Sequence, residues 1–380
     1  MTPDGTQPQP QAKLPPAGGP GVAGPRPGPQ VPPGAPPKQA VPPAAPGGPK
    51  PPAGGRKTTT SPEVQRAIKG VSATSSALIA EVEKAIIGKR NVLEHVLLAI
   101  LADGHILFED FPGTAKSLMV MTFAQALGCK YRRIQFTPDL LPTDITGTYI
   151  YDEKDNEFKF RPGPIFANII LADEINRAPP KTQAAMLEAM QERQVSIEGV
   201  THRLPKPFLV MATQNPIEQE GTYPLPEAQV DRFMQKMSMG YPSREDEREI
   251  LIRRMMRGKD QVDINTITSP EKIIAMQQVV EKVHMDPALL TYIVEIVYRT
   301  REDPRVVVGS SPRGSLALFK LARARAVLQG RDYITPDDVK AVSMPALAHR
   351  IILKPEPRIR GVLPQDIVNK ILAEVPVPAV

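Results

Sequence analysis

The chain has 380 residues, of which 44 are proline and one is cysteine, and its net charge is +6. A single cysteine excludes an intrachain disulfide, and no apolar run approaches the roughly 18 residues of a membrane span. The N-terminus also lacks the apolar region of a secretion signal. We therefore expect a cytoplasmic protein without membrane insertion.

Residues 1–57 differ in composition from the rest of the chain. Nineteen of the first 55 residues are proline, eleven are glycine and none is aromatic. Such a segment buries too little apolar surface to offset its chain entropy, so we predict a disordered tail with polyproline II bias. Pro33–Pro36 and Pro43–Pro46 fit the PxxP spacing of SH3-type ligands. The composition alone produces such spacings, and a passive tether is the favoured interpretation.

The tail also carries most of the net charge. It holds six basic residues against one acid, so only about +1 remains for residues 58–380. A groove for nucleic acid would need a local surplus of lysine and arginine. The charge distribution therefore argues against a helicase-like nucleic-acid channel.

A phosphate-binding loop is predicted after the first strand. A helical segment, residues 61–85, precedes the short apolar strand 105–109, and residues 110–117 then lead into a helical pattern. The usual G-x-x-x-x-G-K-[ST] pattern fails at both glycines, because Asp110 and Ala115 replace them. The chemistry survives: Lys116 can reach the β- and γ-phosphates, the Ser117 hydroxyl can bind Mg²⁺, and backbone N–H groups can cradle oxygens. The alternative is an ordinary strand-to-helix turn.

Two further apolar runs end in polar groups. Residues 168–172 run directly into Asp173 and Glu174, and residues 208–213 end near Asn215. Continuous apolar runs are typical of strands buried on both faces of a parallel sheet, whose carboxyl ends hold the ligand. Adjacent carboxylates at that edge can bind Mg²⁺ and polarise a water molecule, as nucleotide hydrolysis requires. These strands make the ordinary-turn alternative for the loop improbable.

Two β-hairpins are predicted between these strands. In the first, Tyr149 and Tyr151 alternate on one strand, Phe158 and Phe160 on the other, and residues 154–156 form the turn. It would interrupt the second helix of the core. The second hairpin covers 195–204 with its turn at Glu198. They either project towards a substrate or pack only on the core.

Helical signals dominate after residue 242. N-cap side chains followed by acidic residues recur at Ser243, Ser269 and Thr335, and residues 287–300 and 312–329 read as helices between them. The predicted fold is an α/β nucleotide-binding core, a parallel sheet with helices on both faces, plus an all-helical lid. The predicted boundaries are 1–57 for the tail, 58–240 for the core and 241–380 for the lid.

Roughly residues 75–355 resemble the MoxR family of AAA+ ATPases. The resemblance rests on four blocks, which are residues 109–117, 135–147, 172–183 and 212–233. The two hairpins are similar to those of the helix-2-insert branch of AAA+ proteins. MoxR-like loops often carry Glu-Asp before the phosphate loop and alanine at its second glycine, so the departures at Asp110 and Ala115 fit.

The resemblance implies roles for individual residues. Lys116 would be the Walker A lysine, Ser117 and Asp173 the magnesium ligands, and Glu174 the catalytic base. Three more would act on the γ-phosphate end of the nucleotide: Asn215 as sensor 1, Arg232 as arginine finger and Arg313 as sensor 2, in cis or in trans. The remaining nucleotide contacts would be Ile87 and Gly88 at the adenine, and Pro112, Gly113, Thr114, Ala115 and Leu118 in the loop. Gln135 occupies the place of a residue that gates the catalytic glutamate.

The resemblance also implies a function. The protein would be a ring, expected to be hexameric, that uses ATP and Mg²⁺ to remodel or mature a client protein, with a partner that contains a von Willebrand factor A domain. One alternative is a nucleic-acid motor or transcription-regulatory ATPase of the same AAA+ branch, against which the near-neutral folded part argues. Another is a nucleotide-binding scaffold without turnover, against which the complete set of site residues argues.

Overall fold

The computed structural model describes residues 60–216 and 222–379. These residues form one compact unit. The predicted tail, with its PxxP spacings, lies outside the described residues. No helix within the described ranges is long and apolar enough to cross a bilayer.

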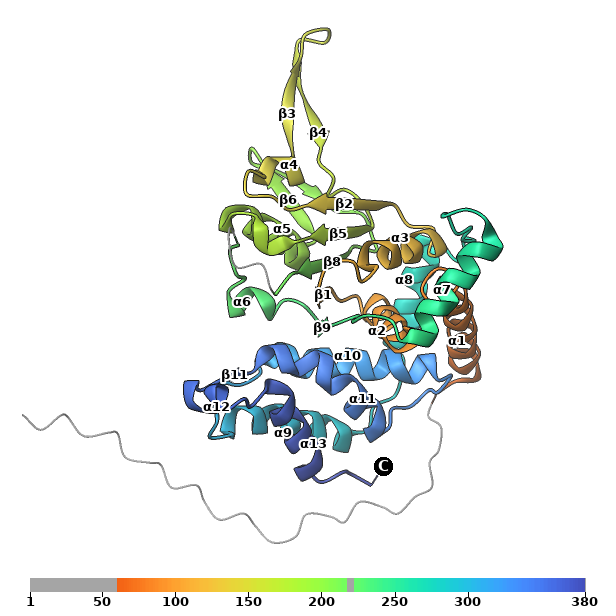
Figure 1. The fold of residues 1–380 in the computed structure, drawn as a ribbon, viewed down its shortest axis with the longest axis vertical. Coiled ribbons are helices and arrows are strands. Elements are labelled where there is room, and N and C mark those ends of the chain that lie inside the picture. Colours follow the sequence, from red (N-terminus) through yellow and green to blue (C-terminus); the bar gives the residue numbers. More distant parts are fainter. Residues whose placement is uncertain (1–59, 217–221, 380) are drawn as a thin grey trace, which may run out of the picture. The chain divides into compact units, whose positions relative to one another are not determined.

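The core is a parallel sheet with the strand order β2-β5-β8-β1-β9 (Figure 1). Its strands are β1 (Ile106–Glu109), β2 (Tyr131–Gln135), β5 (Ile169–Asp173), β8 (Leu209–Gln214) and β9 (Gln235–Met237). Every residue of β5 is buried, as the apolar run predicted. The register pairs Gln135 with Asp173 and Ala172 with Ala212. The polar ends of three strands therefore meet at one edge, which confirms the predicted parallel α/β core.

The two faces of the sheet support two hydrophobic clusters. Because side chains alternate along a strand, Ile169 and Leu171 of β5 join one cluster, and Ile170 and Ala172 join the other. The first cluster includes α1 (Pro62–Val82), α2 (Arg90–Leu101) and α3 (Lys116–Ala126), and the second includes α5 (Pro180–Glu192). Both faces of the sheet are thus covered, as a sheet of parallel strands requires.

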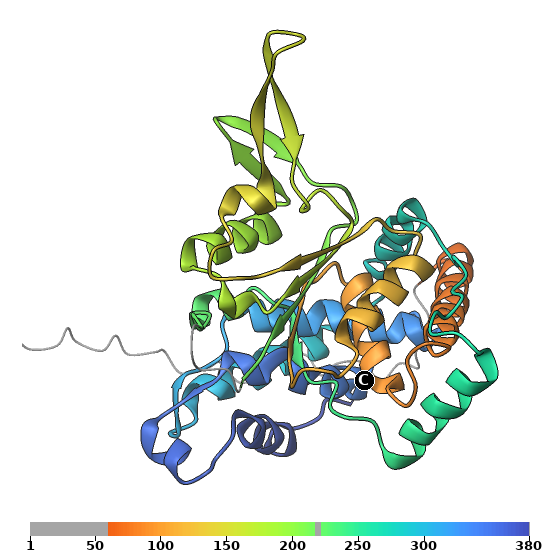
Figure 2. The same cartoon turned by 45° about the horizontal axis from the view of Figure 1, so that its top comes forward.

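Both predicted hairpins are present. They are β3 (Gly147–Asp152) with β4 (Glu157–Pro162) and β6 (Gln194–Ile197) with β7 (Val200–Arg203). The turn of the second hairpin has φ of 50° at Glu198 and 81° at Gly199, which is the conformation of a two-residue hairpin turn that follows strand twist. The β3–β4 hairpin extends away from the sheet, as two views show (Figures 1 and 2).

The expectation that the first hairpin interrupts a core helix is only half right. The short helix α4 (Pro142–Thr146) precedes β3. After β4, residues 163–168 form turns and bends that lead directly into β5, so no helix resumes. Gly163 explains the close return of the chain, because a Cβ there would lie 2.2 Å from the carbonyl oxygen of Ile145.

The C-terminal part is helical, as predicted. Its helices are α7 (Arg244–Arg257), α8 (Pro270–Val280), α9 (Pro287–Glu302), α10 (Pro312–Leu328), α11 (Pro336–Leu347), α12 (Pro355–Ile359) and α13 (Pro364–Glu374), whereas the short helix α6 (Glu227–Val230) precedes β9 in the core. Shorter pieces of this part are the 3-10 helix η2 (Ala348–Arg350) and the strands β10 (Val306–Val308) and β11 (Ile352–Leu353). In the core, the 3-10 helix η1 (Ile175–Arg177) directly follows β5. Ser243 and Ser269 cap α7 and α8 with their hydroxyls.

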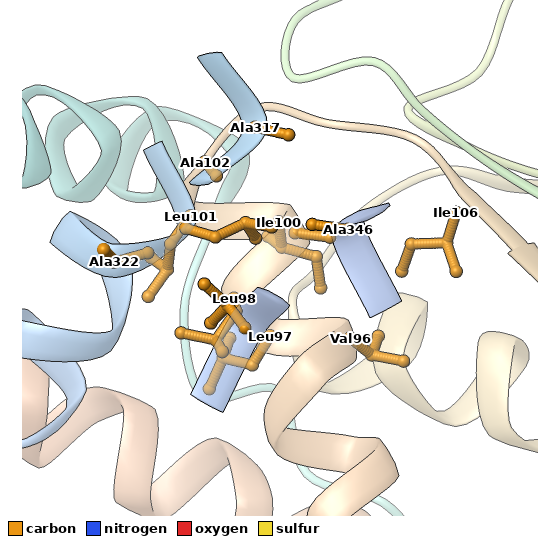
Figure 3. Packing of buried hydrophobic residues seen from close by; sticks show 14 of the residues in the cluster. Val96, Leu97, Leu98, Ile100, Leu101, Ala102, Ile106, Ala317, Ala322 and Ala346 are labelled. Atoms are coloured by element: carbon orange, nitrogen blue, oxygen red, sulfur yellow. The ribbon is translucent and has the colours of Figure 1, made fainter. Parts of the chain in front are cut away.

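Helix α10 joins the C-terminal helices to the core. Its buried Ala317 and Ala322 belong to the same hydrophobic cluster as Leu98 and Leu101 of α2 (Figure 3). Small side chains on α10 allow the two helices to approach closely. The domain boundary between residues 240 and 241 stays a prediction, because the described residues form one compact unit.

Candidate active site

The predicted phosphate loop and three strand ends surround a cavity of about 390 Å³, which we call the phosphate cavity. Its volume is within the range of small-molecule sites. The loop lies between β1 and α3, and α3 begins at Lys116. The lining residues are Asp110, Pro112, Gly113, Thr114, Ala115, Lys116, Ser117, Leu118, Arg133, Asp173, Glu174, Thr213, Gln214 and Asn215. The structure thus brings together the predicted loop residues and the three predicted strand-end residues.

The loop backbone adopts the left-handed conformation twice. Gly113 has φ of 82° and Ala115 has φ of 61°. Glycine accepts this region freely, but an L-residue does so at a cost of about 1–2 kcal/mol. Ala115 is also the N-cap of α3, and the first residues of that helix, Lys116 to Leu118, line the cavity.

Lys116 is held by its own loop. Its Nζ donates to the carbonyl oxygen of Phe111 at 2.8 Å and to Thr114 Oγ1 at 3.0 Å. Burial lowers the pKa of Lys116, while the charges of Asp110, Asp173 and Glu174 act in the opposite direction. The ammonium group therefore lies in a partly desolvated site, where its attraction to phosphate is stronger than in water.

Asp110 anchors the chain that follows β9. Its buried carboxylate accepts hydrogen bonds from the Ser238 hydroxyl at 2.7 Å, from the Gly240 N–H at 3.2 Å and from the Met239 N–H. The prediction that its charge need not face the nucleotide agrees with these contacts. Replacement of the usual glycine by aspartate thus ties the loop entrance to the segment before α7.

Asp173 has a partner for each carboxylate oxygen. Thr213 Oγ1 donates to Oδ1 at 2.6 Å, and Arg133 donates to Oδ2 from Nη2 at 2.6 Å and from Nε at 2.9 Å. Sequence reasoning missed both partners. The signals were an arginine two residues before Gln135, hence on the same face of β2, and a threonine one residue inside the end of β8.

Glu174 is held on the same side of the cavity. Its Oε2 accepts from Gln135 Nε2 at 2.6 Å and from Arg177 Nη1 at 3.0 Å, and its N–H donates to Thr213 Oγ1 at 2.8 Å. Its φ of 56° is again left-handed. Gln135 thus contacts the glutamate that the resemblance expects it to gate. The role of Arg177 was not anticipated.

The predicted adenine contacts lie elsewhere on the described surface. Ile87 and Gly88 occupy the turn between α1 and α2, and they are not among the described residues that line the phosphate cavity. Gly88 has φ of 72°, and a Cβ there would lie 2.1 Å from the Asp246 carboxylate. The left-handed backbone and the contact with the Asp246 side chain of α7 both favour glycine at this position.

Both candidate arginines are likewise absent from the described lining of the phosphate cavity. They share a different cavity of about 230 Å³. Arg232 Nη1 donates to the carbonyl oxygen of Leu187 at 3.0 Å. Arg313, at the start of α10, lies 3.5 Å from Asp231 Oδ2 and 3.3 Å from Gln191 Oε1.

The residues present fit a magnesium ion. Among residues 60–216 and 222–379, no group of three or more His, Cys, Asp or Glu side chains could hold a metal. Mg²⁺ does not require one, because it keeps several waters and binds one or two protein groups plus substrate phosphates. Ser117 and Asp173 supply such oxygens to one cavity.

Comparison with known proteins places this geometry in a family. The profile described as "ATPase family associated with various cellular activities (AAA)" matches residues 105–235, and the AAA lid domain profile matches residues 298–371. Chaperone MoxR1 of Mycobacterium tuberculosis is 45% identical over 316 residues, which cover 81% of this chain and 83% of that protein. The chain belongs to the MoxR family of AAA+ ATPases.

Other relatives agree with this family. The uncharacterized protein YeaC of Bacillus subtilis is 48% identical over 301 residues, covering 79% of this chain and 93% of YeaC. Protein MoxR of Methylorubrum extorquens is 30% identical over 323 residues, covering 78% and 93%. The crystal structure of a candidate ATPase from Cytophaga hutchinsonii has a TM-score of 0.78 at 40% identity and covers 83% of this chain and 98% of that one. The family is one of nucleotide-binding ATPases.

Proposed function

We propose that this MoxR-family ATPase works as a ring, most simply a hexamer, that hydrolyses ATP with Mg²⁺ to remodel or mature a client protein. The observation that carries the proposal is the phosphate cavity, into which the start of α3 brings Lys116 and the end of β5 brings Asp173 and Glu174. A lysine for the phosphates, a carboxylate for a metal and a second carboxylate for water are the groups that phosphoryl transfer to water requires.

Within this proposal each residue has a defined task. Lys116 and the N–H groups at the start of α3 bind the β- and γ-phosphates. Ser117 and Asp173 hold Mg²⁺, which supplies charge neutralisation at the phosphate oxygens when bound. Glu174 takes a proton from the attacking water, and Asn215 orients that water. The Asp173–Arg133 contact of 2.6 Å must loosen for Asp173 to bind a metal directly.

The positions of two arginines support a ring. Arg232 and Arg313 line a cavity other than the one that holds the phosphate loop. We assign both to the γ-phosphate of a neighbouring subunit, so that Arg313 acts in trans like the finger Arg232. A site on one subunit and its arginines on another make a head-to-tail interface, which closes into a ring when the rotation permits.

One relative supports the proposed client role, and the family resemblance supports the proposed partner. Chaperone MoxR1 is named as a chaperone, and the family suggests a partner with a von Willebrand factor A domain. The β3–β4 hairpin presents Tyr151 and Phe158, whose side chains are 50% and 68% exposed. Exposed aromatic rings are common protein contact points, so this hairpin is the candidate client-binding element.

Three variants test the enzymatic part of the proposal. Lys116→Ala should lose ATP binding, whereas Glu174→Gln should bind ATP and lose on the order of 10²–10⁴-fold in turnover. Arg232→Ala should bind ATP normally and turn it over on the order of 10³-fold more slowly. Sizing with ATP and Mg²⁺ should show a ring of full-length chains. A monomer at micromolar concentration would refute the ring. Unchanged turnover in Arg232→Ala would refute the arginine-finger role.

A trapping experiment tests the biological part. Glu174→Gln with ATP is incubated with native lysate, and captured molecules are compared with those on Lys116→Ala. Capture of a von Willebrand-type protein, or of a metalloprotein under assembly, supports the client proposal. Recovery of nuclease-sensitive DNA or RNA, together with salt-dependent DNA binding by residues 58–380, would favour the nucleic-acid motor.

A further inference from the structure

We infer that Asp231 and Arg350 are positioning residues that hold Arg232 and Arg313 in the geometry needed for the neighbour's nucleotide. The inference rests on the proposed function, because it takes both arginines to act in trans. Neither Asp231 nor Arg350 touches the phosphate cavity among its described lining residues. They act through the two arginines beside them.

The Asp231 carboxylate is the meeting point of three segments. Its oxygens accept from the Ser311 hydroxyl at 2.9 and 3.0 Å and from Arg350 Nε at 2.9 Å, and Arg313 lies 3.5 Å away. Ser311 also caps α10 by accepting from the Arg313 N–H at 3.1 Å. The start of the helix that carries Arg313 is therefore fixed directly to the residue before Arg232.

Arg350 holds the backbone on either side of Arg232. Its Nη2 donates to the carbonyl oxygens of Asp231 at 3.1 Å and Phe233 at 2.7 Å, and its Nη1 donates to that of Met234 at 3.4 Å. A further bond to the Ala346 carbonyl oxygen ties the same guanidinium to α11. A planar fork with five donors can hold several acceptors in fixed directions, which a lysine cannot do.

Burial keeps the Asp231–Arg350 ion pair together. The Arg350 side chain is 2% exposed and that of Asp231 is 19% exposed. A buried charge that loses its partner is costly, typically about 3–5 kcal/mol, so the pair has little freedom to separate. By contrast, Arg313 is 44% exposed at its end of the network, and Arg232 Nε has no hydrogen-bond partner among the described residues. The network fixes the backbones of both arginines, while the Arg313 guanidinium stays exposed and that of Arg232 is held by its bond to the Leu187 carbonyl oxygen.

The cavity beside the network has the charge expected for this task. Besides Arg232 and Arg313 it is lined by Arg193, Lys320 and Arg350, against Asp103 and Asp231. Lys320 lies seven residues after Arg313 on α10 and hence on the same helix face. A surplus of cations at a partly exposed surface attracts phosphate oxygens of an incoming partner. The partner of matching chemistry is the nucleotide-loaded face of a second copy of this chain.

The test separates positioning from simple structural damage. Asp231→Asn should keep the ATP affinity of its own site, measured with a fluorescent ATP analogue, and lower kcat on the order of 10²-fold, since a displacement of about 1 Å has such an effect. Mixed with Glu174→Gln, whose arginines are intact, it should recover roughly a quarter of the wild-type rate. In a randomly mixed ring, about this fraction of interfaces places a subunit with intact Glu174 opposite a subunit with intact Asp231 and correctly held arginines.

One variant serves as a control, and another serves as a second test. Asp338→Asn removes a carboxylate that is 2% exposed and paired with Arg331 at 2.6 Å. Its bonds go to Arg331 and Thr335 and not to Asp231 or Arg350, so the variant should leave kcat unchanged. Ser311→Ala removes a hydroxyl and keeps the Asp231 charge, so it covers the case in which Asp231→Asn does not fold. It should also lower kcat and recover on mixing with Glu174→Gln.

The mixtures distinguish this inference from the proposed function. If Arg232→Ala mixed with Glu174→Gln recovers activity while Asp231→Asn and Ser311→Ala mixtures do not, the positioning role is wrong and the trans arginine stands. If no mixture recovers, including that with Arg232→Ala, the trans arginine itself is wrong. If Asp338→Asn and Asp231→Asn lower kcat equally, both carboxylates act only by supporting the structure in general, and the positioning role is wrong.

Discussion

At the scale of single residues, the site is built from strained and cross-linked side chains. Ala115 and Glu174 both occupy the left-handed region, with φ of 61° and 56°. Non-glycine residues persist there only when their surroundings determine the conformation. At Glu174 the surroundings are the hydrogen bonds from Gln135 and Arg177 and the bond to Thr213. Strain at two residues of the cavity lining supports a site shaped for chemistry.

Glycine at position 115 should stabilise the protein. Ala115→Gly restores the usual loop glycine and removes the left-handed penalty, so the free energy of unfolding should rise by about 1 kcal/mol. Chemical denaturation measures it. Ala77→Gly, at an exposed position of α1, is the matched control and should lower stability by about 1 kcal/mol. A loss of stability in Ala115→Gly would show that the strain assignment is wrong.

Removing the Gln135 amide should release the candidate base. Gln135→Ala eliminates the 2.6 Å bond to Glu174, while ATP contacts elsewhere remain. Basal turnover should rise about two- to tenfold, the range that a net hydrogen-bond contribution of about 0.5–1.5 kcal/mol allows. Gln125→Ala, whose amide bonds to Ile264, is the control. An unchanged or lower basal rate at normal ATP affinity would mean that Gln135 does not restrain Glu174.

At the scale of elements, the two hairpins are joined by an aromatic cluster. Phe160 of β4 stacks on His202 of β7 with ring centroids 4.0 Å apart, and Tyr149 Oη lies 3.3 Å from His202 Nε2. Nearer the tip on the same face of the hairpin, Tyr151 and Phe158 are paired across the strands and contact only one another among the ring pairs of the described residues. The aromatic pair near the base of the hairpin thus fastens it to the second hairpin, and the pair near the tip is exposed.

The base and the tip of this hairpin should respond differently to truncation of their phenylalanines. Phe160→Ala should cost about 1–3 kcal/mol, less than a fully buried phenylalanine, and should speed amide hydrogen exchange in both hairpins. Phe158→Ala should leave exchange in β6 and β7 unchanged, because its side chain is 68% exposed. Hydrogen exchange with mass spectrometry on both variants measures the protection of each hairpin and tests this difference. Equal protection of residues 194–203 in Phe160→Ala and wild type would contradict the coupling.

At the scale of the whole molecule, neutral histidines tie distant parts together. His105 accepts from the Val210 N–H at Nδ1, which leaves Nε2 to donate to the Met190 carbonyl oxygen. Burial lowers the pKa of His105 to about 3. Burial also lowers the pKa values of His95, beside Gln235, and of His349, beside Phe233. All three are held in their uncharged form.

The protein should therefore lose stability in mild acid. The folded-state pKa of each histidine lies below its ordinary value near 6.5, so the unfolded chain binds more protons below that pH. The stabilisation is complete above about pH 6.5 and decreases as the pH falls towards the folded values, about 3 for His105. Urea unfolding should give a falling free energy from about pH 6.5 to about pH 4.5. His105→Gln should flatten this slope, and an unchanged slope would exclude His105 as a contributor.

Much of the fold and of the phosphate site was predictable from the sequence. Buried parallel strands are continuous apolar runs, and the chemistry at their ends is contiguous with them, so Asp173, Glu174 and Asn215 could be placed at one sheet edge. The glycine and Asp-Asn turns likewise marked both hairpins. The loop was recognisable without its glycines, because Lys116 and Ser117 follow a strand and begin a helix.

The sequence by itself determined which elements form, because strand and helix periodicity and capping are local properties of the chain. Only the tertiary structure decided which side chains meet. Strand order places Arg133 against Asp173, the path after β9 brings Ser238 to Asp110, and the return of η2 brings Arg350 to Asp231 across 119 positions. Such pairs depend on packing between distant segments, and no local pattern records it.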